Sequence, residues 1–148
     1  HAPIHHHHRR RAALVAQLYI WAKKDGTGTV FDSSGGFSLP NGAVRAPDAC
    51  WVSTEQLAKL TEEELEAFPP LCPEFVIELR SATDPVKSLQ EKMLEYIANG
   101  TQLGWLLDAK SKNVHVYAPD GVTMLEAPEK VEVTGNLQGF VLDLLEVW

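Results

Sequence analysis

Along this 148-residue chain, apolar and polar positions alternate in some segments with the period of a helix and in others with the period of a strand. Residues 9–24 and 86–98 repeat apolar side chains three and four positions apart without an internal Gly or Pro, so each segment predicts an amphipathic helix. AsnGly at 99–100 ends the second helix. Short runs rich in β-branched, aromatic and Leu residues predict strands near 29–32, 36–39, 48–53, 74–80, 103–108 and 113–118.

The segments between these elements carry turn and cap signals. ProAsnGly at 40–42 is a hairpin signal. The acidic residues 54–67 predict short surface helices, with a capping box from Thr61 to Glu64. Edge strands and an apolar C-terminal stretch complete the chain. The order of helix, strands, helix and strands predicts a mixed α/β (α+β) fold, one twisted sheet flanked by helices in a single domain over residues 1–148.

Composition and charge narrow the class of protein. No apolar run reaches the roughly 18–20 residues of a membrane span, so we expect no membrane-spanning helix and no membrane partner. The net charge of −7 argues against a protein that coats nucleic acid without specificity, because phosphate neutralisation drives such binding. It leaves open an enzyme with a local basic surface or a divalent metal. Cys50 and Cys72 match no zinc spacing and predict buried free thiols in a cytoplasmic protein.

The opening HAPIHHHHRRR allows more than one interpretation. Residues 1–8 are either native sequence, a purification-tag remnant or a junction across a gap. The four histidines at 5–8 are therefore a weak basis for a metal site.

Three polar features interrupt segments that otherwise favour burial. Asp48 follows a proline at a strand entry, where a plain turn is the simpler interpretation. Glu78 and Arg80 lie on one face of a strongly apolar strand. An ion pair there adds ~0–1 kcal/mol if exposed and often fails to repay its desolvation if buried, which favours a functional role. Lys92 and Tyr96, four residues apart, share one face of the second helix.

Together these residues supply the groups that cleave a phosphodiester bond. Carboxylates from Asp48 and Glu78 form a hard oxygen site for Mg²⁺, with Mn²⁺ as a substitute, and the backbone carbonyl of Leu79 is a third ligand. The metal lowers the pKa of bound water and polarises the phosphoryl oxygen. We expect Lys92 to position the attacking water and to offset negative charge, because a lysine serves as a base only when its pKa is depressed.

Four segments in order carry a resemblance to known nucleases. They are RAPDACWV at 45–52, PEFVIELRSATD at 73–84, EKMLEYIANG at 91–100 and LGWLLDAKSKNVHVYAPDG at 103–121. They resemble the PD-(D/E)XK nuclease superfamily and, within it, the Uma2-like restriction endonuclease family. That family shows R-x-P-D, P-x-x-V-x-E-V-x-S, K-x-x-x-Y-x-x-x-G, W-x-V-D and V-x-V-Y. The match extends over roughly residues 9–121.

The resemblance implies a restriction-endonuclease-like fold and assigns roles to residues. Asp48 and Glu78 match the metal-binding carboxylates, Lys92 the helix-borne lysine and Tyr96 the tyrosine that orients it, although a plain packing role also suits Tyr96. Arg80 stands where the superfamily usually has its lysine, so it is expected to clamp a phosphate or to pair with Glu78.

Two departures from the family pattern also follow. The superfamily often adds an acidic residue from the first helix, where this chain has only Gln17 and the basic residues 9–11. An N-terminal segment usual in the family is also missing.

Three functions remain in competition. The first is a Mg²⁺-dependent endonuclease that cuts DNA as a homodimer, with apolar surface around Trp105 and the C-terminus for a second copy. The second is a catalytically inactive nuclease-fold module for binding or assembly. It is favoured by the acidic balance, by the missing lysine two residues after Glu78 and by the absent first-helix carboxylate. The third is a structural domain with an incidental Glu78–Arg80 ion pair, distant from Asp48.

Overall fold

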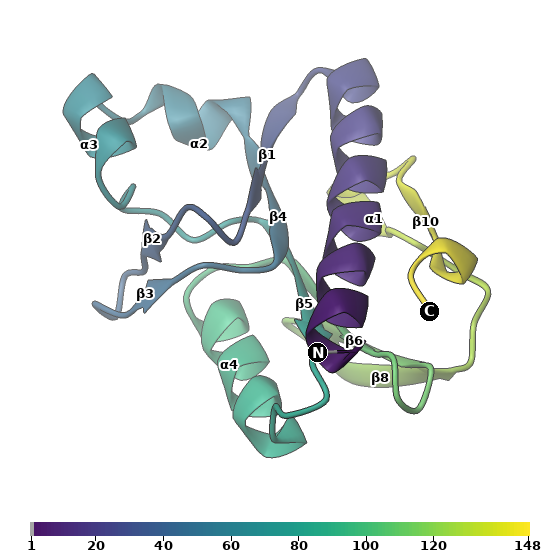
Figure 1. Cartoon of the computed structure of the whole chain (residues 1–148). Helices are drawn as coiled ribbons and strands as arrows, with labels where there is room; N and C mark the ends of the chain where they lie inside the picture. The colour runs from purple at the N-terminus through teal and green to yellow at the C-terminus, as the bar shows by residue number, and fades with distance from the viewer. Residues whose placement is uncertain (1) are drawn as a thin grey trace.

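The computed structural model describes residues 2–148 and arranges them as a six-stranded sheet with helices against both faces (Figure 1). The helices are α1 Ala2–Asp25, α2 Thr54–Ala58, α3 Glu62–Glu66 and α4 Val86–Ala98, with 3₁₀ turns at Gly135–Leu137 and Leu144–Glu146. The strands are β1 Gly28–Asp32, β2 Phe37–Ser38, β3 Val44–Arg45, β4 Ala49–Ser53, β5 Phe75–Arg80, β6 Leu103–Asp108, β7 Asn113–Ala118, β8 Gly121–Glu126, β9 Lys130–Glu132 and β10 Val141–Asp143.

The strand order of the main sheet is β1-β4-β5-β6-β7-β8. Among the strands of residues 2–148, β5 and β6 form the one parallel pair, and all other neighbours run antiparallel. A parallel connection needs a crossover, and α4 supplies it. Helix α4 therefore begins close to the end of β5 and packs back along the sheet, as predicted for a mixed sheet flanked by helices.

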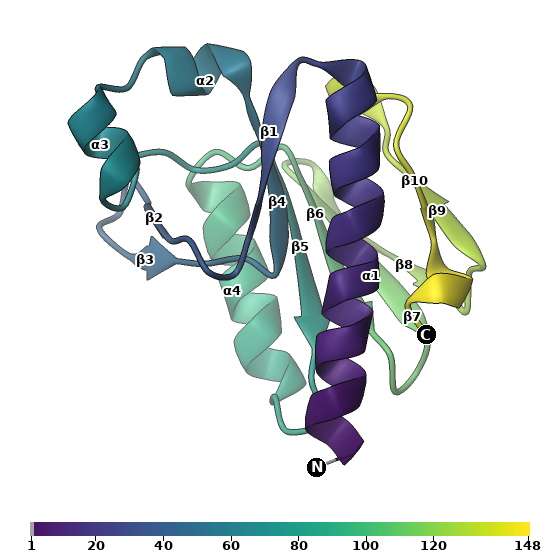
Figure 2. The ribbon, with the colours of Figure 1, turned by 45° about the horizontal axis from the view of Figure 1, so that its top comes forward.

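Helices α1 and α4 lie on opposite faces of the sheet (Figure 2), and each face carries its own hydrophobic core. Helix α1 covers one face, where Leu14 and Leu18 pack in the cluster that holds Ile77, Leu79 and Trp105. Helix α4 covers the other face and packs there through Leu89, Met93 and Tyr96. Since side chains alternate along β5, the face that receives α4 also receives the side chain of Glu78.

Several predicted elements are confirmed, and others are corrected. The helix at 86–98, the strands at 103–108 and 113–118, and the capping box at Thr61 have the predicted bounds. Helix α1 begins at Ala2, earlier than predicted, because the histidine and arginine run contains no helix breaker after its first turn.

The prediction for the segment near 36–39 was also too simple. Strand β2 pairs with β3, a strand that was not predicted, in a separate two-stranded sheet. Each strand has only two residues, which is too short to show alternation.

Trp105 does not support the predicted dimer contact. Its side chain is fully buried within the chain, against Phe75 and Phe140. Both cysteines are buried free thiols, as predicted. None of the helices in residues 2–148 combines the length and apolar character that crossing a bilayer requires.

Replacement of Gly28 by Ala should destabilise the fold. A Cβ at this position would overlap the indole ring of Trp51, which is rigid and 6% exposed. We expect a loss of about 1–3 kcal/mol in the free energy of unfolding, measured by urea denaturation. Gly35→Ala is the matched control because open space surrounds that position, so its change should stay within about 0.5 kcal/mol. Equal stabilities of the two variants would contradict the prediction.

Candidate active site

Strand register brings together two acids that lie thirty positions apart in the sequence. In the antiparallel pair β4–β5, Ala49 lies opposite Ile77, so the preceding residue, Asp48, falls next to Glu78. Opposite residues of antiparallel strands have Cβ atoms roughly 4.5–5.5 Å apart. The backbone N–H of Leu79 donates a 2.8 Å hydrogen bond to Asp48 Oδ2, which holds this carboxylate against β5.

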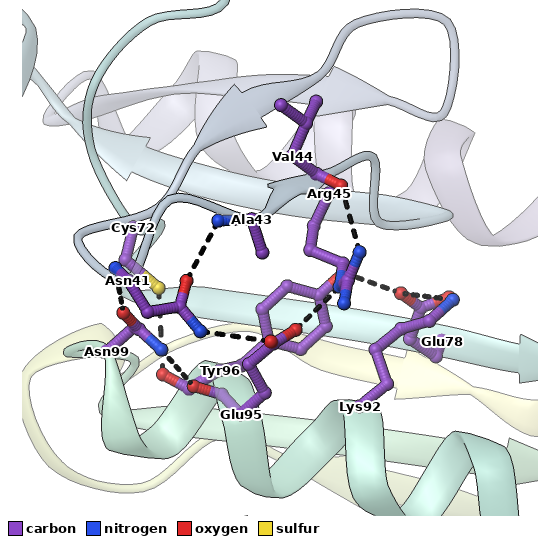
Figure 3. A network of polar contacts seen from close by, with 10 residues as sticks. All are labelled: Asn41, Ala43, Val44, Arg45, Cys72, Glu78, Lys92, Glu95, Tyr96 and Asn99. Atoms are coloured by element: carbon purple, nitrogen blue, oxygen red, sulfur yellow. Dashed lines mark hydrogen bonds and ion pairs between the residues drawn. The ribbon is translucent and has the colours of Figure 1, made fainter.

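Helix α4 supplies two polar groups to Glu78 (Figure 3). The Tyr96 hydroxyl donates a 2.8 Å hydrogen bond to Glu78 Oε2, and Lys92 Nζ lies 3.9 Å from the same oxygen. Lys92 and Tyr96 reach one carboxylate because residues four apart share a helix face. Tyr96 was expected to orient Lys92. Its hydroxyl instead contacts Glu78 directly.

Burial sets the protonation of Glu78. The residue is 4% exposed, and this desolvation, followed by the charge of Asp48, raises its pKa to about 8. Lys92 and the Tyr96 hydrogen bond act in the opposite direction but are the weaker effects. Burial and the neighbouring Glu78 raise the pKa of Tyr96 as well, so its hydroxyl stays a neutral donor. Near neutral pH the buried site therefore tends to hold a proton when no cation is bound.

Helix α1 contributes a cation to the other carboxylate. Arg11 Nε lies 3.0 Å from Asp48 Oδ1, although the group is not aligned as a hydrogen bond. The two oxygens of Asp48 thus each have one partner. Gln17 is not part of this arrangement, because its amide exchanges hydrogen bonds with the backbone of Asp143. Of the features noted on the first helix, Gln17 and the basic residues 9–11, only the basic residues reach the site, through Arg11.

A cavity of about 410 Å³ contains the three predicted catalytic residues. Its lining includes Asp48, Glu78 and Lys92, together with Leu79 and Asp84. The three side chains on which the catalytic prediction depends therefore face one space. Asp84 was not predicted to line it, and its carboxylate accepts a hydrogen bond from the backbone N–H of Ser81.

His7 and Arg11 complete the wall of this cavity and were missed by sequence reasoning. Their spacing was a usable signal, since positions 7, 11, 14 and 18 form one stripe of a helix whose last two members are core leucines. The Nδ1 atom of His7 is buried without a hydrogen-bond partner in the described part of the chain. Burial lowers the pKa of His7, while the charge of Asp48 opposes this change.

Arg80 is not the partner of Glu78, and this alternative was wrong. Parallel register places Arg80 beside Asp108 on β6, and its guanidinium lies 2.9 Å from Asp108 Oδ2. Its Nε donates a second hydrogen bond, of 3.1 Å, to the carbonyl of Asp84. The third competing function required a Glu78–Arg80 pair far from Asp48, and neither condition is met.

A surface hairpin braces α4 from outside the cavity (Figure 3). Arg45 Nε lies 2.6 Å from Glu95 Oε1, and the Asn41 amide donates a 3.0 Å hydrogen bond to Glu95 Oε2. The Asn99 side chain accepts a 2.9 Å hydrogen bond from the Asn41 backbone. These contacts hold the C-terminal end of α4, which follows Lys92, against the hairpin.

The donor set for a metal is limited to two carboxylates. Within residues 2–148, no three His, Cys, Asp or Glu side chains gather closely enough to hold a metal ion. The predicted use of the Leu79 carbonyl stays a prediction.

Similarity to known proteins establishes the fold and the family of this chain. The structure is similar to a crystal structure from Anabaena variabilis, described as a putative nuclease belonging to DUF820, with a TM-score of 0.74. The two chains are 21% identical, and the similarity covers 87% of this chain and 72% of that one, which establishes the fold. The Uma2 family model, described as "Putative restriction endonuclease", matches residues 2–145, so the chain belongs to the Uma2 family. Among curated proteins, none matches.

Stability should depend on pH through Glu78. Its pKa is about 8 in the folded protein against an ordinary value of 4.5, so between these values the folded state holds more protons than the unfolded state. The free energy of unfolding should therefore fall as pH rises from 5 to 8. The free energy of unfolding of Glu78→Gln should exceed that of wild type by on the order of a few kcal/mol at pH 8 and by little at pH 5.

Urea midpoints in EDTA at pH 5, 6.5 and 8 measure this difference. Glu126→Gln, at an exposed position on β8, is the matched control and should follow the wild-type curve. Parallel curves for wild type and Glu78→Gln would contradict the prediction.

Proposed function

We propose that this protein is a divalent-metal-dependent endonuclease of the PD-(D/E)XK type that hydrolyses phosphodiester bonds in DNA. The observation that supports it most is that one cavity contains Asp48, Glu78 and Lys92. Membership of the Uma2 family supports the same reaction class. Buried carboxylates with little structural benefit are typical of sites that bind cations.

The residues present fit a hard cation with a small ligand set. The contacts of Glu78 to Tyr96 and Lys92 both use Oε2, so within the described residues Oε1 keeps its lone pairs for a cation. Mg²⁺ is commonly held by one or two carboxylates and several waters, which matches Asp48 and Glu78 in a cavity of about 410 Å³. When bound, the metal would polarise the phosphoryl oxygen and lower the pKa of water. Mn²⁺ would be a substitute, and Leu79 would add its carbonyl.

The side chains around the pair have distinct roles in this proposal. Lys92 holds the attacking water and offsets the negative charge that develops on the phosphate. Arg11, already beside Asp48, provides a second cation in the lining of the same cavity. Tyr96 fixes the orientation of Glu78 through its hydroxyl. A bound substrate would exclude water from the cavity and strengthen each of these interactions.

Cleavage of both strands of a duplex requires two sites, so we propose that the protein acts as a homodimer. With Trp105 buried, the remaining apolar candidates near the C-terminus are Val141 and Leu145, which are 44% and 67% exposed.

The second candidate function, a nuclease-fold module that binds without cleaving, is favoured by one contact. Arg11 already neutralises Asp48, and no first-helix carboxylate joins the pair in the described chain. Calorimetry with Mg²⁺ or Mn²⁺ separates the two functions. Binding supports the endonuclease, and no binding supports the module.

Glu78→Gln should abolish cleavage of plasmid and linear DNA in Mg²⁺. The substitution preserves shape and the acceptor for Tyr96 but removes the charge that holds the metal, so we expect a loss of at least about 10³-fold in rate. Glu126→Gln on the exposed strand β8 should cleave at the wild-type rate. Undiminished cleavage by Glu78→Gln would remove the proposed site.

Lys92→Ala should lower kcat by on the order of 10²–10³-fold, because it removes a cation at the position where charge develops. Lys87→Ala is the matched control, since Lys87 is exposed on the same helix and does not line the cavity. Single-turnover cleavage by the two variants measures the difference. A similar loss in both would assign the effect to general electrostatics of α4.

A further inference from the structure

A second cavity adjoins the first and is not used by the proposed reaction. It has a volume of about 350 Å³, and the two cavities share His7, Ser81 and Ala82 in their walls. The lining of the second cavity also includes Arg10, Arg80 and Lys110. The shared residues therefore separate the second cavity from the one that Asp48 and Glu78 line.

The charge of this second cavity is opposite to that of the protein. Three permanent cations, from Arg10, Arg80 and Lys110, face a single carboxylate, that of Asp108. Both oxygens of Asp108 are already engaged, one by Arg80 at 2.9 Å and the other by the backbone N–H of Lys110 at 3.1 Å. In a chain of net charge −7, a local excess of cations marks a place that attracts an anion.

Arg10 has no carboxylate of its own. No ion pair within residues 2–148 involves it, and its buried Nε has no hydrogen-bond partner there. Its one contact is 3.5 Å to the backbone oxygen of Trp148, which is long for a hydrogen bond. Burial lowers the pKa of Arg10, the direction expected for a cation drawn partly out of water. A half-buried guanidinium with free donors is suited to a phosphate, which it can bind in a bidentate manner.

We propose that the second cavity binds the phosphate that neighbours the scissile phosphate in the substrate strand. The proposal rests on the proposed function, which places the scissile phosphate beside Asp48 and Glu78. Arg80 then has a distinct task, because it lines the second cavity and not the first. Lys92 and Arg11 are the cations beside the carboxylate pair, and Arg80, which stands in place of the strand lysine, serves the neighbouring phosphate.

Calorimetry with small nucleotides tests the subsite without cleavage. The probes are thymidine 3′,5′-bisphosphate, which carries two phosphates on one nucleoside, and the 3′- and 5′-monophosphates, all in Ca²⁺. We expect wild type to bind the bisphosphate at least about tenfold more tightly than either monophosphate. Arg10→Ala should bring this ratio close to one. Lys110→Ala should also lower this ratio, and the variant should keep its fold because the Lys110 side chain is exposed.

Arg9→Ala is the matched control, because Arg9 is an exposed cation on the same helix turn and lines neither cavity. Its ratio should equal that of wild type. The proposal is overturned if wild type does not prefer the bisphosphate, or if Arg9→Ala and Arg10→Ala lower the ratio equally. Cleavage of DNA by wild type is measured separately, so cleavage without a bisphosphate preference would remove the subsite and leave the endonuclease. A preference without cleavage would remove the endonuclease and leave an anion site.

Discussion

The register between β4 and β5 is the constraint on which the site depends. It sets Asp48 beside Glu78 in a position where the two side chains are only 11% and 5% exposed. Burial there disfavours a charged carboxylate, and the like charge of Asp48 adds to this cost, so the pKa of Glu78 is raised. The fold maintains the pair with an N–H from Leu79 and a hydroxyl from Tyr96. Without a bound cation, such an arrangement costs stability, because burial of a carboxylate beside a like charge is unfavourable.

Cations reach the pair from both faces of the sheet. Lys92 comes from α4, and Arg11 from α1, which packs on the opposite face and extends to the end of β5 (Figure 2). The two carboxylates therefore come from β5 and from the residue that precedes β4, and the two cations come from helices. Arg80 is the exception, since it lies on β5 but is directed to Asp108 and the adjacent cavity.

Much of the fold was predictable because its elements show clear periodicity. Helix α4 and strands β6 and β7 have the predicted bounds, and alternation correctly placed Glu78 on the face opposite Ile77. Contacts that depend on register between distant segments were not predictable. The pairing of Arg80 with Asp108 follows from a parallel register that no local pattern encodes. Arg11 was missed although the sequence held a signal for it, because its helical spacing from the core residues Leu14 and Leu18 was not used.

The hairpin of β2 and β3 gives the lysine-bearing helix an anchor outside the sheet. Its Arg45 and Asn41 clamp Glu95 and Asn99 on α4, so the orientation of the helix is shared between the hydrophobic core and a polar surface joint. Variation in this small hairpin, more than forty positions earlier in the sequence, is thus transmitted to the amine at position 92. Substitutions in this solvent-facing loop can therefore change the position of the Lys92 amine while Asp48 and Glu78 stay the same.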